Sequence, residues 1–366
     1  MRLHGWMLWG QNAQWVQGTW SVEGGIIRSV PEGQGNTCAD FTGFFTPGFA
    51  DVHCHIGIGP DGPVDIDVQK AQMEAQLSSG VLLVRDCGVP VDNSQVRLHS
   101  SVPVLIRCGQ HIARVKRYIR GLPREIEPAD LPEVMAQEAR RGDGWVKIVG
   151  DWIDRSQGAQ ADLAPLWPRE ALIDGVAAAH EAGARVAVHA FSHTVIDDLL
   201  EAGVDDIEHG SGMDAVQLQC AKERGIAVTP TLQQVELFAD FAAQAGRKYP
   251  MYAATMQAMY DTRVAHAQML FDSGVQILSG TDSGGYQEHG CIGDELRLWL
   301  AAGLRPERIL DYATWGTRSY LGFSSLDEGK SADMVFFRED PRENPSVWGK
   351  PDVVFSAGVP VYCRDS

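Results

Sequence analysis

Residues 44–56 read FFTPGFADVHCHI, a short apolar run that ends in two histidines separated by one residue. Alternate side chains of a strand point to the same side, so His53 and His55 share one face and Cys54 takes the other. Similar apolar runs begin at residues 81, 102, 145, 185, 205, 226 and 275. Short strands that alternate with amphipathic helices predict a parallel α/β fold.

Helical patterns lie between most of these runs, and glycines follow them. The patterns cover residues 128–141, 168–183, 192–203 and 214–225. Gly183, Gly203, Gly225 and Gly274 come just after a helical pattern and suit left-handed C-cap positions. An open doubly wound sheet would need a glycine-rich phosphate loop, and no G-x-G-x-x-G follows the first strand. Eight strands in this order therefore predict a (β/α)8 TIM barrel over residues 44–323.

The two ends of the chain have a different pattern. Residues 1–43 contain short β-type runs such as TWSVEGGIIRSV, with glycine turns. Residues 324–366 contain LDEGKSADMVFFREDP and DVVFSAGVPVYC, which also read as strands and turns. We expect both ends to combine into one small β-sandwich domain beside the barrel.

Composition limits the partners and the compartment. The net charge of −17 argues against nucleic acid or an anionic membrane as a partner. The N-terminus, MRLHGWMLWGQNAQW, has no signal-peptide pattern, and no apolar stretch approaches the ~20 residues of a membrane span. Seven cysteines without a C-x-x-C pair predict reduced thiols in the cytoplasm. The partner is expected to be a small-molecule substrate, and the sequence leaves open whether the chain forms a homo-oligomer.

Metal-ligand residue types occur at the ends of five predicted strands, which is the active-site side of a barrel. They are His53, His55, Lys147, His189, His209 and Asp282. Each has an ordinary structural alternative: a histidine in the core, a lysine stem packed on apolar neighbours, an aspartate that caps a turn. The coincidence of all six at one mouth favours a metal centre.

The same motifs resemble those of a known family. TPGFADVHCHI (46–56) is similar to the P-G-x-x-D-x-H-x-H opening of amidohydrolase-superfamily barrels. VKI, VHA, IEHG and SGTDSG resemble the fourth, fifth, sixth and eighth strand motifs, and LDEGKSADMVFF resembles the return to the small β-domain. VRDCG and CGQH look like the prolidase and Xaa-dipeptidase-like branch, with Gln110 in place of a glycine. The resemblance covers nearly the whole chain.

The resemblance implies a binuclear zinc site. His53, His55 and Asp282 would hold the buried ion, and His189 and His209 the other. A carbamylated Lys147 would bridge them, because an unmodified ammonium has no lone pair for a cation. Imidazole and carboxylate suit zinc, and Mn²⁺ or Fe²⁺ fits the same ligands.

The implied reaction is attack on an amide carbonyl by a metal-activated hydroxide. Asp282 would take the proton of the attacking water and pass it to the leaving amine. His111 would donate a hydrogen bond to the developing oxyanion, with a surface-loop histidine as the alternative.

Substrate recognition is expected from loops at the same mouth. The segment RVKRYIR (114–120) carries Arg114, Lys116, Arg117 and Arg120. An arginine fork suits a substrate carboxylate, so Arg114, Arg117 and Arg120 are candidate substrate-binding residues. A solvated basic loop is the alternative. Thr231 and Gln233, after the seventh strand, are expected to line the pocket.

Four functions compete. Hydrolysis of an amide bond in a dipeptide or N-acyl amino acid fits the whole ligand set. A mononuclear deaminase of a nucleobase-like ring would carry H-x-x-E near the fifth strand, where this chain has HAFSH (189–193), and would leave Lys147 without a role. A lactonase or cyclic-amide hydrolase would use the same site. The fourth alternative is a binding protein without activity, and the intact set of metal-ligand residues argues against it.

Overall fold

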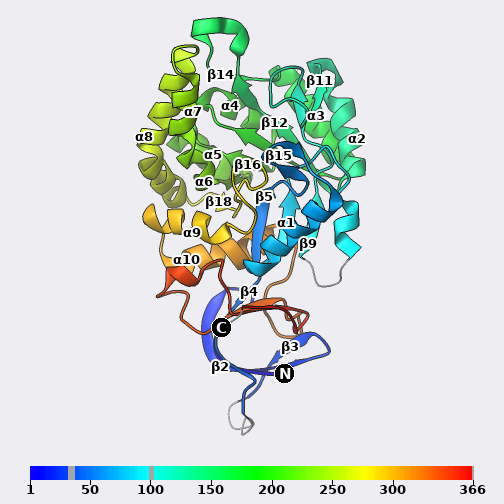
Figure 1. The fold of residues 1–366 in the computed structure, drawn as a ribbon, viewed down its shortest axis with the longest axis vertical. Coiled ribbons are helices and arrows are strands. Elements are labelled where there is room, and N and C mark those ends of the chain that lie inside the picture. Colours follow the sequence, from blue (N-terminus) through cyan, green and yellow to red (C-terminus); the bar gives the residue numbers. More distant parts are fainter. Residues whose placement is uncertain (32–37, 99–102, 365–366) are drawn as a thin grey trace.

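The computed structural model describes residues 1–31, 38–98 and 103–364, and its parallel strands follow the predicted order (Figure 1). They are β5 (Phe49–Cys54), β8 (Val81–Asp86), β9 (Val104–Arg107), β12 (Trp145–Val149), β15 (Arg185–Ala190), β16 (Asp206–His209), β17 (Ala227–Thr229) and β18 (Gln276–Ile277). Each falls within a run predicted from the sequence. Val102, where the third run begins, lies outside the described residues.

The third predicted strand is divided into two pieces. β9 pairs with β8, whereas β10 (Ile112–Arg114) pairs with β12 and with β11 (Arg124–Ile126). Gly109, with a φ of 73°, lies between β9 and β10 and allows the chain to change direction there. The divided strand thereby connects the sheet β5-β8-β9 to the sheet β11-β10-β12-β15-β16-β17-β18.

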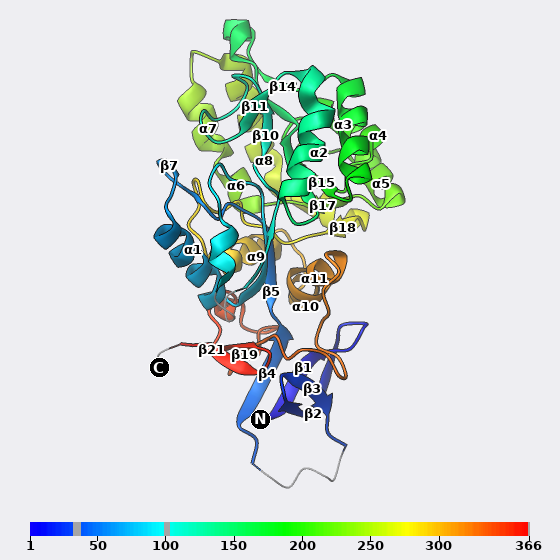
Figure 2. The ribbon, with the colours of Figure 1, turned by 90° about the vertical axis from the view of Figure 1, so that its right-hand side faces the viewer.

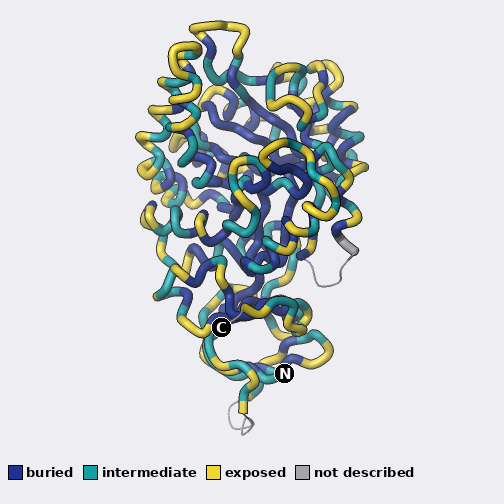
Figure 3. The backbone as a smooth tube through the Cα atoms, in the orientation of Figure 1, coloured by how far each residue is buried: buried dark blue, intermediate teal, exposed yellow. Residues whose placement is uncertain are grey.

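The first parallel strand also lies beside the last one. The backbone N–H of Val52 donates to the Ser279 carbonyl at 2.9 Å, and that of His55 donates to the Ser283 carbonyl at 2.8 Å. The parallel strands therefore wind around a common core. Buried residues concentrate in these strands, and exposed residues lie mainly on the surrounding helices and loops (Figure 3).

Helices cover the outside of the parallel strands (Figure 1). They are α1 (Ile66–Ser78), α2 (Leu131–Arg141), α3 (Arg169–Glu181), α4 (His193–Ala202), α5 (Ala215–Arg224), α6 (Leu232–Glu236), α7 (Phe238–Ala245), α8 (Pro250–Ser273), α9 (Ile292–Ala301), α10 (Pro306–Asp311) and α11 (Thr317–Tyr320). Gly203, Gly225 and Gly274 end α4, α5 and α8 in the left-handed conformation, as predicted. Within the described ranges, none of these helices has the length and apolar character that a membrane crossing requires.

The chain ends meet in one seven-stranded sheet below the parallel strands (Figure 2). Its order is β21 (Val359–Cys363), β20 (Val353–Ser356), β19 (Met334–Phe337), β4 (Phe41–Pro47), β1 (Arg2–Trp9), β2 (Gln14–Glu23) and β3 (Ile26–Ser29). Central β4 runs antiparallel to β19 and parallel to β1, so the N- and C-terminal segments share a core that includes Leu3, Phe45 and Phe336. The two-layered packing of a sandwich stays a prediction.

Residues 44–47 belong to this terminal sheet, although the sequence pattern placed them in the first barrel strand. Phe45 is fully buried in the core of the terminal sheet. At Gly48 the backbone N–H donates to the Asp333 carbonyl at 3.2 Å, and β5 begins at the next residue. A break at Pro47 and Gly48 thus divides the continuous apolar run 44–56 between two sheets. The assigned ends, 1–43 and 324–366, include residues 32–37 and 365–366, which lie outside the described residues.

Candidate active site

The carboxyl end of β5 brings two histidines to an aspartate. His53 is buried, and its Nε2 lies 3.0 Å from Oδ1 of Asp282. The Nε2 of His55 lies 3.5 Å from the same oxygen. Asp282 has a φ of 59°, an uncommon conformation for a residue other than glycine, and such strain clusters at functional sites. Three predicted ligands therefore converge on one point.

Two further imidazoles complete the cluster. The ring centroids of His189 and His209 are 4.7 Å apart, and those of His53 and His209 are 4.8 Å apart. His53, His209 and Asp282 each offer one ligand-type atom, and these atoms lie within 4.8 Å of one another. The ends of β5, β15 and β16 thus place these groups around a space of the right size for a cation.

Neighbouring groups orient two of the imidazoles. Nδ1 of His209 lies 2.6 Å from Oγ1 of Thr231, and Nδ1 of His55 lies 3.4 Å from the Gly88 carbonyl. A proton on Nδ1 in each ring leaves the lone pair on Nε2, the nitrogen that faces the cluster from His55. Partners of this kind fix the tautomer and direction of metal-binding histidines. Thr231, predicted to line the pocket, is buried against His209.

Replacing this partner should weaken metal binding. Thr231→Val keeps the shape of the side chain but removes the oxygen that His209 Nδ1 contacts. We expect roughly ten- to hundredfold lower metal affinity, the usual effect of losing such a partner. Competition with a chromophoric chelator measures it, with Thr262→Val on the exposed face of α8 as the matched control. Equal affinity in both variants would remove Thr231 from the orienting role.

Lys147 belongs to a buried ionic network. Its Nζ contacts Oε2 of Glu208, and the other oxygen of Glu208 accepts from Arg85 Nη2 at 2.9 Å. Arg85 also donates to Asp206 at 2.6 Å, and Cys87 Sγ lies 3.1 Å from Glu208. Sequence reasoning missed Glu208 and Arg85. The alternation in β16 could have revealed them, because it turns the carboxylates of Asp206 and Glu208 inward, where they require a buried cation.

Burial keeps the ligand-type nitrogens uncharged. Loss of hydration lowers the pKa of His53 to about 4 and holds the pKa values of His189 and His209 well below the ordinary value. Neutral imidazole is the form that binds a metal. Burial also lowers the pKa of the Lys147 ammonium, which favours the amine. Among the buried atoms without a hydrogen-bond partner in the described chain are His53 Nδ1 and His189 Nε2. This donor set fits a cation.

A family match agrees with this geometry. The model of the amidohydrolase family matches residues 44–361. The chain belongs to the amidohydrolase family. As a member of this metal-dependent family, it is a hydrolase that acts on carbon–nitrogen bonds of amides.

Known relatives and solved structures support the assignment. An uncharacterised protein of Mycobacterium tuberculosis is 42% identical over 340 residues, which cover 93% of this chain and 90% of the relative. The ochratoxinase of Aspergillus niger is 26% identical over 223 residues, 59% of this chain and 45% of that protein. The structure of a Xaa-Pro dipeptidase with methionine in its active site superposes with a TM-score of 0.80 at 22% identity, covering 99% of both chains. The family and these structural neighbours confirm an α/β fold of the TIM-barrel type.

His111, the expected oxyanion donor, adopts a different hydrogen-bonding state. Its Nδ1 lies 2.8 Å from the Gly88 carbonyl, which can only accept, so the ring donates through Nδ1. Its Nε2 is buried without a partner among the described residues and carries the lone pair. Burial lowers the pKa of His111 to about 3, so the ring is neutral near pH 7. The geometry favours an acceptor at this position, and the predicted donor role requires a protonated ring.

A cavity opens above the cluster. Its lining residues are His55, Ile58, His111, Tyr118, Ile119, Leu122, Trp152, His189, Gln234, Asp282, Gly285 and Tyr286. The loop 114–120 contributes Tyr118 and Ile119, whereas its basic residues are not part of this lining. Arg117 Nη2 instead donates to the carbonyls of Trp152 and Ala164 at 3.3 and 3.4 Å.

The other predicted recognition residues also lie away from the lining. Arg114 is half-buried, and Lys116 and Arg120 are exposed. Gln233 donates to the Cys291 carbonyl at 3.2 Å, and the adjacent Gln234 lines the cavity in its place. Carboxylate recognition by the basic loop therefore stays a prediction, with no contact to the cavity in its favour.

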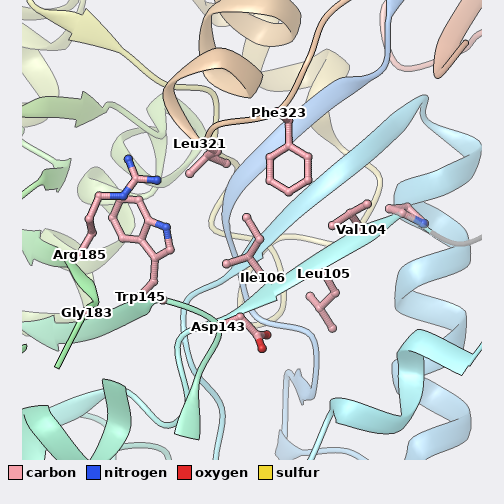
Figure 4. A pocket seen from close by; sticks show the side chains of 11 residues that line it. Val104, Leu105, Ile106, Asp143, Trp145, Gly183, Arg185, Leu321 and Phe323 are labelled. Carbon is pink, nitrogen blue, oxygen red and sulfur yellow. The ribbon is translucent and has the colours of Figure 1, made fainter. Parts of the chain in front are cut away.

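A separate hollow lies at the opposite, amino ends of β9, β12 and β15 (Figure 4). Ile106, Leu321 and Phe323 give it an apolar wall. The guanidinium of Arg185 stacks over the Trp145 ring at 4.4 Å. No histidine is among its lining residues, whereas His55, His111 and His189 line the cavity above the cluster.

Proposed function

We propose that this protein hydrolyses the amide bond of a dipeptide or an N-acyl amino acid at a binuclear metal site. The observation that carries the proposal is the convergence of His53, His55, His209 and Asp282 at one mouth, with His189 beside His209. The amide-hydrolase families of the neighbouring structures support the bond type. The substrate class is our inference from the cavity beside this cluster.

The ligand set divides into two groups around Lys147. His53, His55 and Asp282 would hold one ion, and His189 and His209 the other, with zinc as the expected metal. Carbamylated Lys147 would bridge the two, and its buried, less basic amine supports this because only the neutral amine reacts with CO₂. When bound, the ions would polarise the substrate carbonyl and acidify water.

The chain's own residues would position the substrate and move the proton. Asp282 faces the cavity with Oδ1 between His53 and His55, where it would accept the proton of the attacking water. The same carboxyl would return that proton to the leaving nitrogen. Tyr118 and Trp152, with ring centroids 4.6 Å apart, would exclude bulk water from one side of the reacting bond.

Fold closure and cellular location belong to the same proposal. We infer one closed eight-stranded barrel, supported by the backbone bonds between β5 and residues 279–283. We also infer a cytoplasmic enzyme, because all seven cysteines are described and free, as suits a reducing compartment.

The direct test of the function is a substrate screen. Protein prepared with zinc and bicarbonate is offered dipeptides, N-acyl amino acids, lactones and nucleobases, and release of amine is followed. The proposal expects hydrolysis of a dipeptide or N-acyl amino acid that stops when a chelator removes the metal. Ring deamination, or lactone opening without any amide hydrolysis, would contradict it.

A further inference from the structure

A second cavity adjoins the one above the metal-ligand cluster. Trp152 and Tyr286 line both cavities. The second cavity is also lined by Ile153, Arg155, Phe241, Gln244, Ala245, Tyr249 and Tyr252, and we call it the aromatic pocket. Its walls come from the segment after β12 and from α7 and α8, which lie outside the parallel strands. A group attached to the scissile bond therefore has a defined space to enter.

Five of its nine lining residues are aromatic, and two of them contact each other. The ring centroids of Phe241 and Tyr286 are 5.4 Å apart. Trp152 connects the pocket to the cluster, because its ring lies 5.5 Å from His189. Aromatic walls in tilted and edge-to-face arrangements are well suited to a flat apolar ring. The shape and surface indicate an aromatic substituent.

Among the nine residues that line the pocket, Arg155 carries a charge, in a protein with a net charge of −17. Arg155 is exposed at the wall, and its side chain has no ion pair or hydrogen bond within the described residues. Lys248 Nζ lies 5.1 Å from the centroid of Tyr249, at the same wall. No aspartate or glutamate is among the lining residues. Arg117, by contrast, is already close to Asp154, at 3.8 Å. Among the described residues that line the pocket, Arg155 is thus the cation available to a ligand.

We infer that the aromatic pocket receives an aromatic ring of the substrate and that Arg155 pairs with a carboxylate on the same portion. This inference rests on the proposed function, which places the scissile amide at the cluster. It moves carboxylate recognition from the loop 114–120 to the segment after β12. The unpartnered, buried indole Nε1 of Trp152 is a further donor at the wall shared by the two cavities.

The binding test uses a probe that cannot be hydrolysed. 3-Phenylpropanoate carries a ring and a carboxylate, and 3-phenylpropanamide carries the same ring without charge. Calorimetric titration should show that Arg155→Met weakens binding of the acid roughly three- to tenfold and leaves the amide unchanged. Tyr249→Ala should weaken both probes roughly fivefold because the ring loses its aromatic wall. Arg140→Met, an exposed arginine on α2 that lines neither cavity, is the matched control.

The outcomes separate this inference from the proposed function. Loss of acid binding in Arg120→Met rather than Arg155→Met would overturn it in favour of the basic loop. The inference would also be overturned if the acid and the amide bound with equal affinity to the wild type and also to Arg155→Met. If the acid binds through Arg155 while no amide in the screen is hydrolysed, the proposed function fails and the binding site stands. If amides are hydrolysed without preference for an aromatic carboxylate, the proposed function stands and the inference fails.

Discussion

Asp282→Asn is expected to lower kcat roughly 10²- to 10⁴-fold, the range associated with loss of a positioned acid–base group. The carboxylate Oδ1 lies 3.0 Å from His53 Nε2 and 3.5 Å from His55 Nε2, so it sits where both the metal and the attacking water are proposed to bind. An asparagine of the same size cannot accept the proton. Steady-state kinetics on the amide found in the screen, together with metal content, measures the effect.

The matched control is Asp272→Asn, which neutralises an exposed aspartate near the end of α8. It should leave kcat unchanged. If Asp282→Asn keeps its metal but has a lower kcat, the proton-transfer role is supported. If the variant also binds less metal, the role of Asp282 as a metal ligand is supported. Activity within about threefold of the wild type, with the metal retained, would exclude Asp282 from the chemistry.

Removal of the Lys147 amine is the second change with a large expected effect. Lys147→Met keeps an unbranched stem in the buried site but supplies no anionic bridge. We expect fewer bound ions and a rate loss of roughly 10²- to 10³-fold, since polarisation by a metal ion is worth several kcal/mol. Metal analysis and kcat on folded protein test this, with the exposed Lys350→Met as the control.

A smaller side chain gives a sharper version of the same test. Lys147→Ala leaves a space beside Glu208 that a short carboxylic acid such as acetate fits, whereas Lys147→Met occupies it. Acetate should therefore restore metal binding and part of the activity in Lys147→Ala alone. Full activity in Lys147→Met, or equal rescue of both variants, would contradict a bridging carbamate.

Local patterns predicted the positions of the parallel strands and of the chemistry-bearing residues. His53 and His55 follow from a period of two at the end of a buried strand, and a barrel topology requires the ends of β15 and β16 to meet them. The topology therefore predicts the position of each of these chemistry-bearing residues, even though tens of residues separate them in the sequence. β-type runs at both termini predicted that the two chain ends combine, and in the terminal sheet β4 lies between β1 and β19.

Other features depend on contacts that no local pattern carries. The third strand divides at Gly109, and the chain changes sheets at Gly48. Both features depend on which neighbouring strand forms hydrogen bonds with the backbone. The alternation in β16 indicates that Glu208 points inward, but its partner Arg85 is distant in sequence, and no local pattern identifies that pairing. The direction of Arg117, toward the carbonyl of Trp152, is a loop property of the same kind. Hydrophobic periodicity specifies burial and not the partner of a polar side chain.

The most direct test of the binuclear site is the metal content and intact mass of native protein prepared with zinc and bicarbonate. The account predicts two divalent ions per chain and an added mass of one CO₂ that localises to Lys147. It also predicts that the added mass disappears in Lys147→Met while the fold persists. One ion per chain in fully active protein, with an unmodified Lys147, would contradict it.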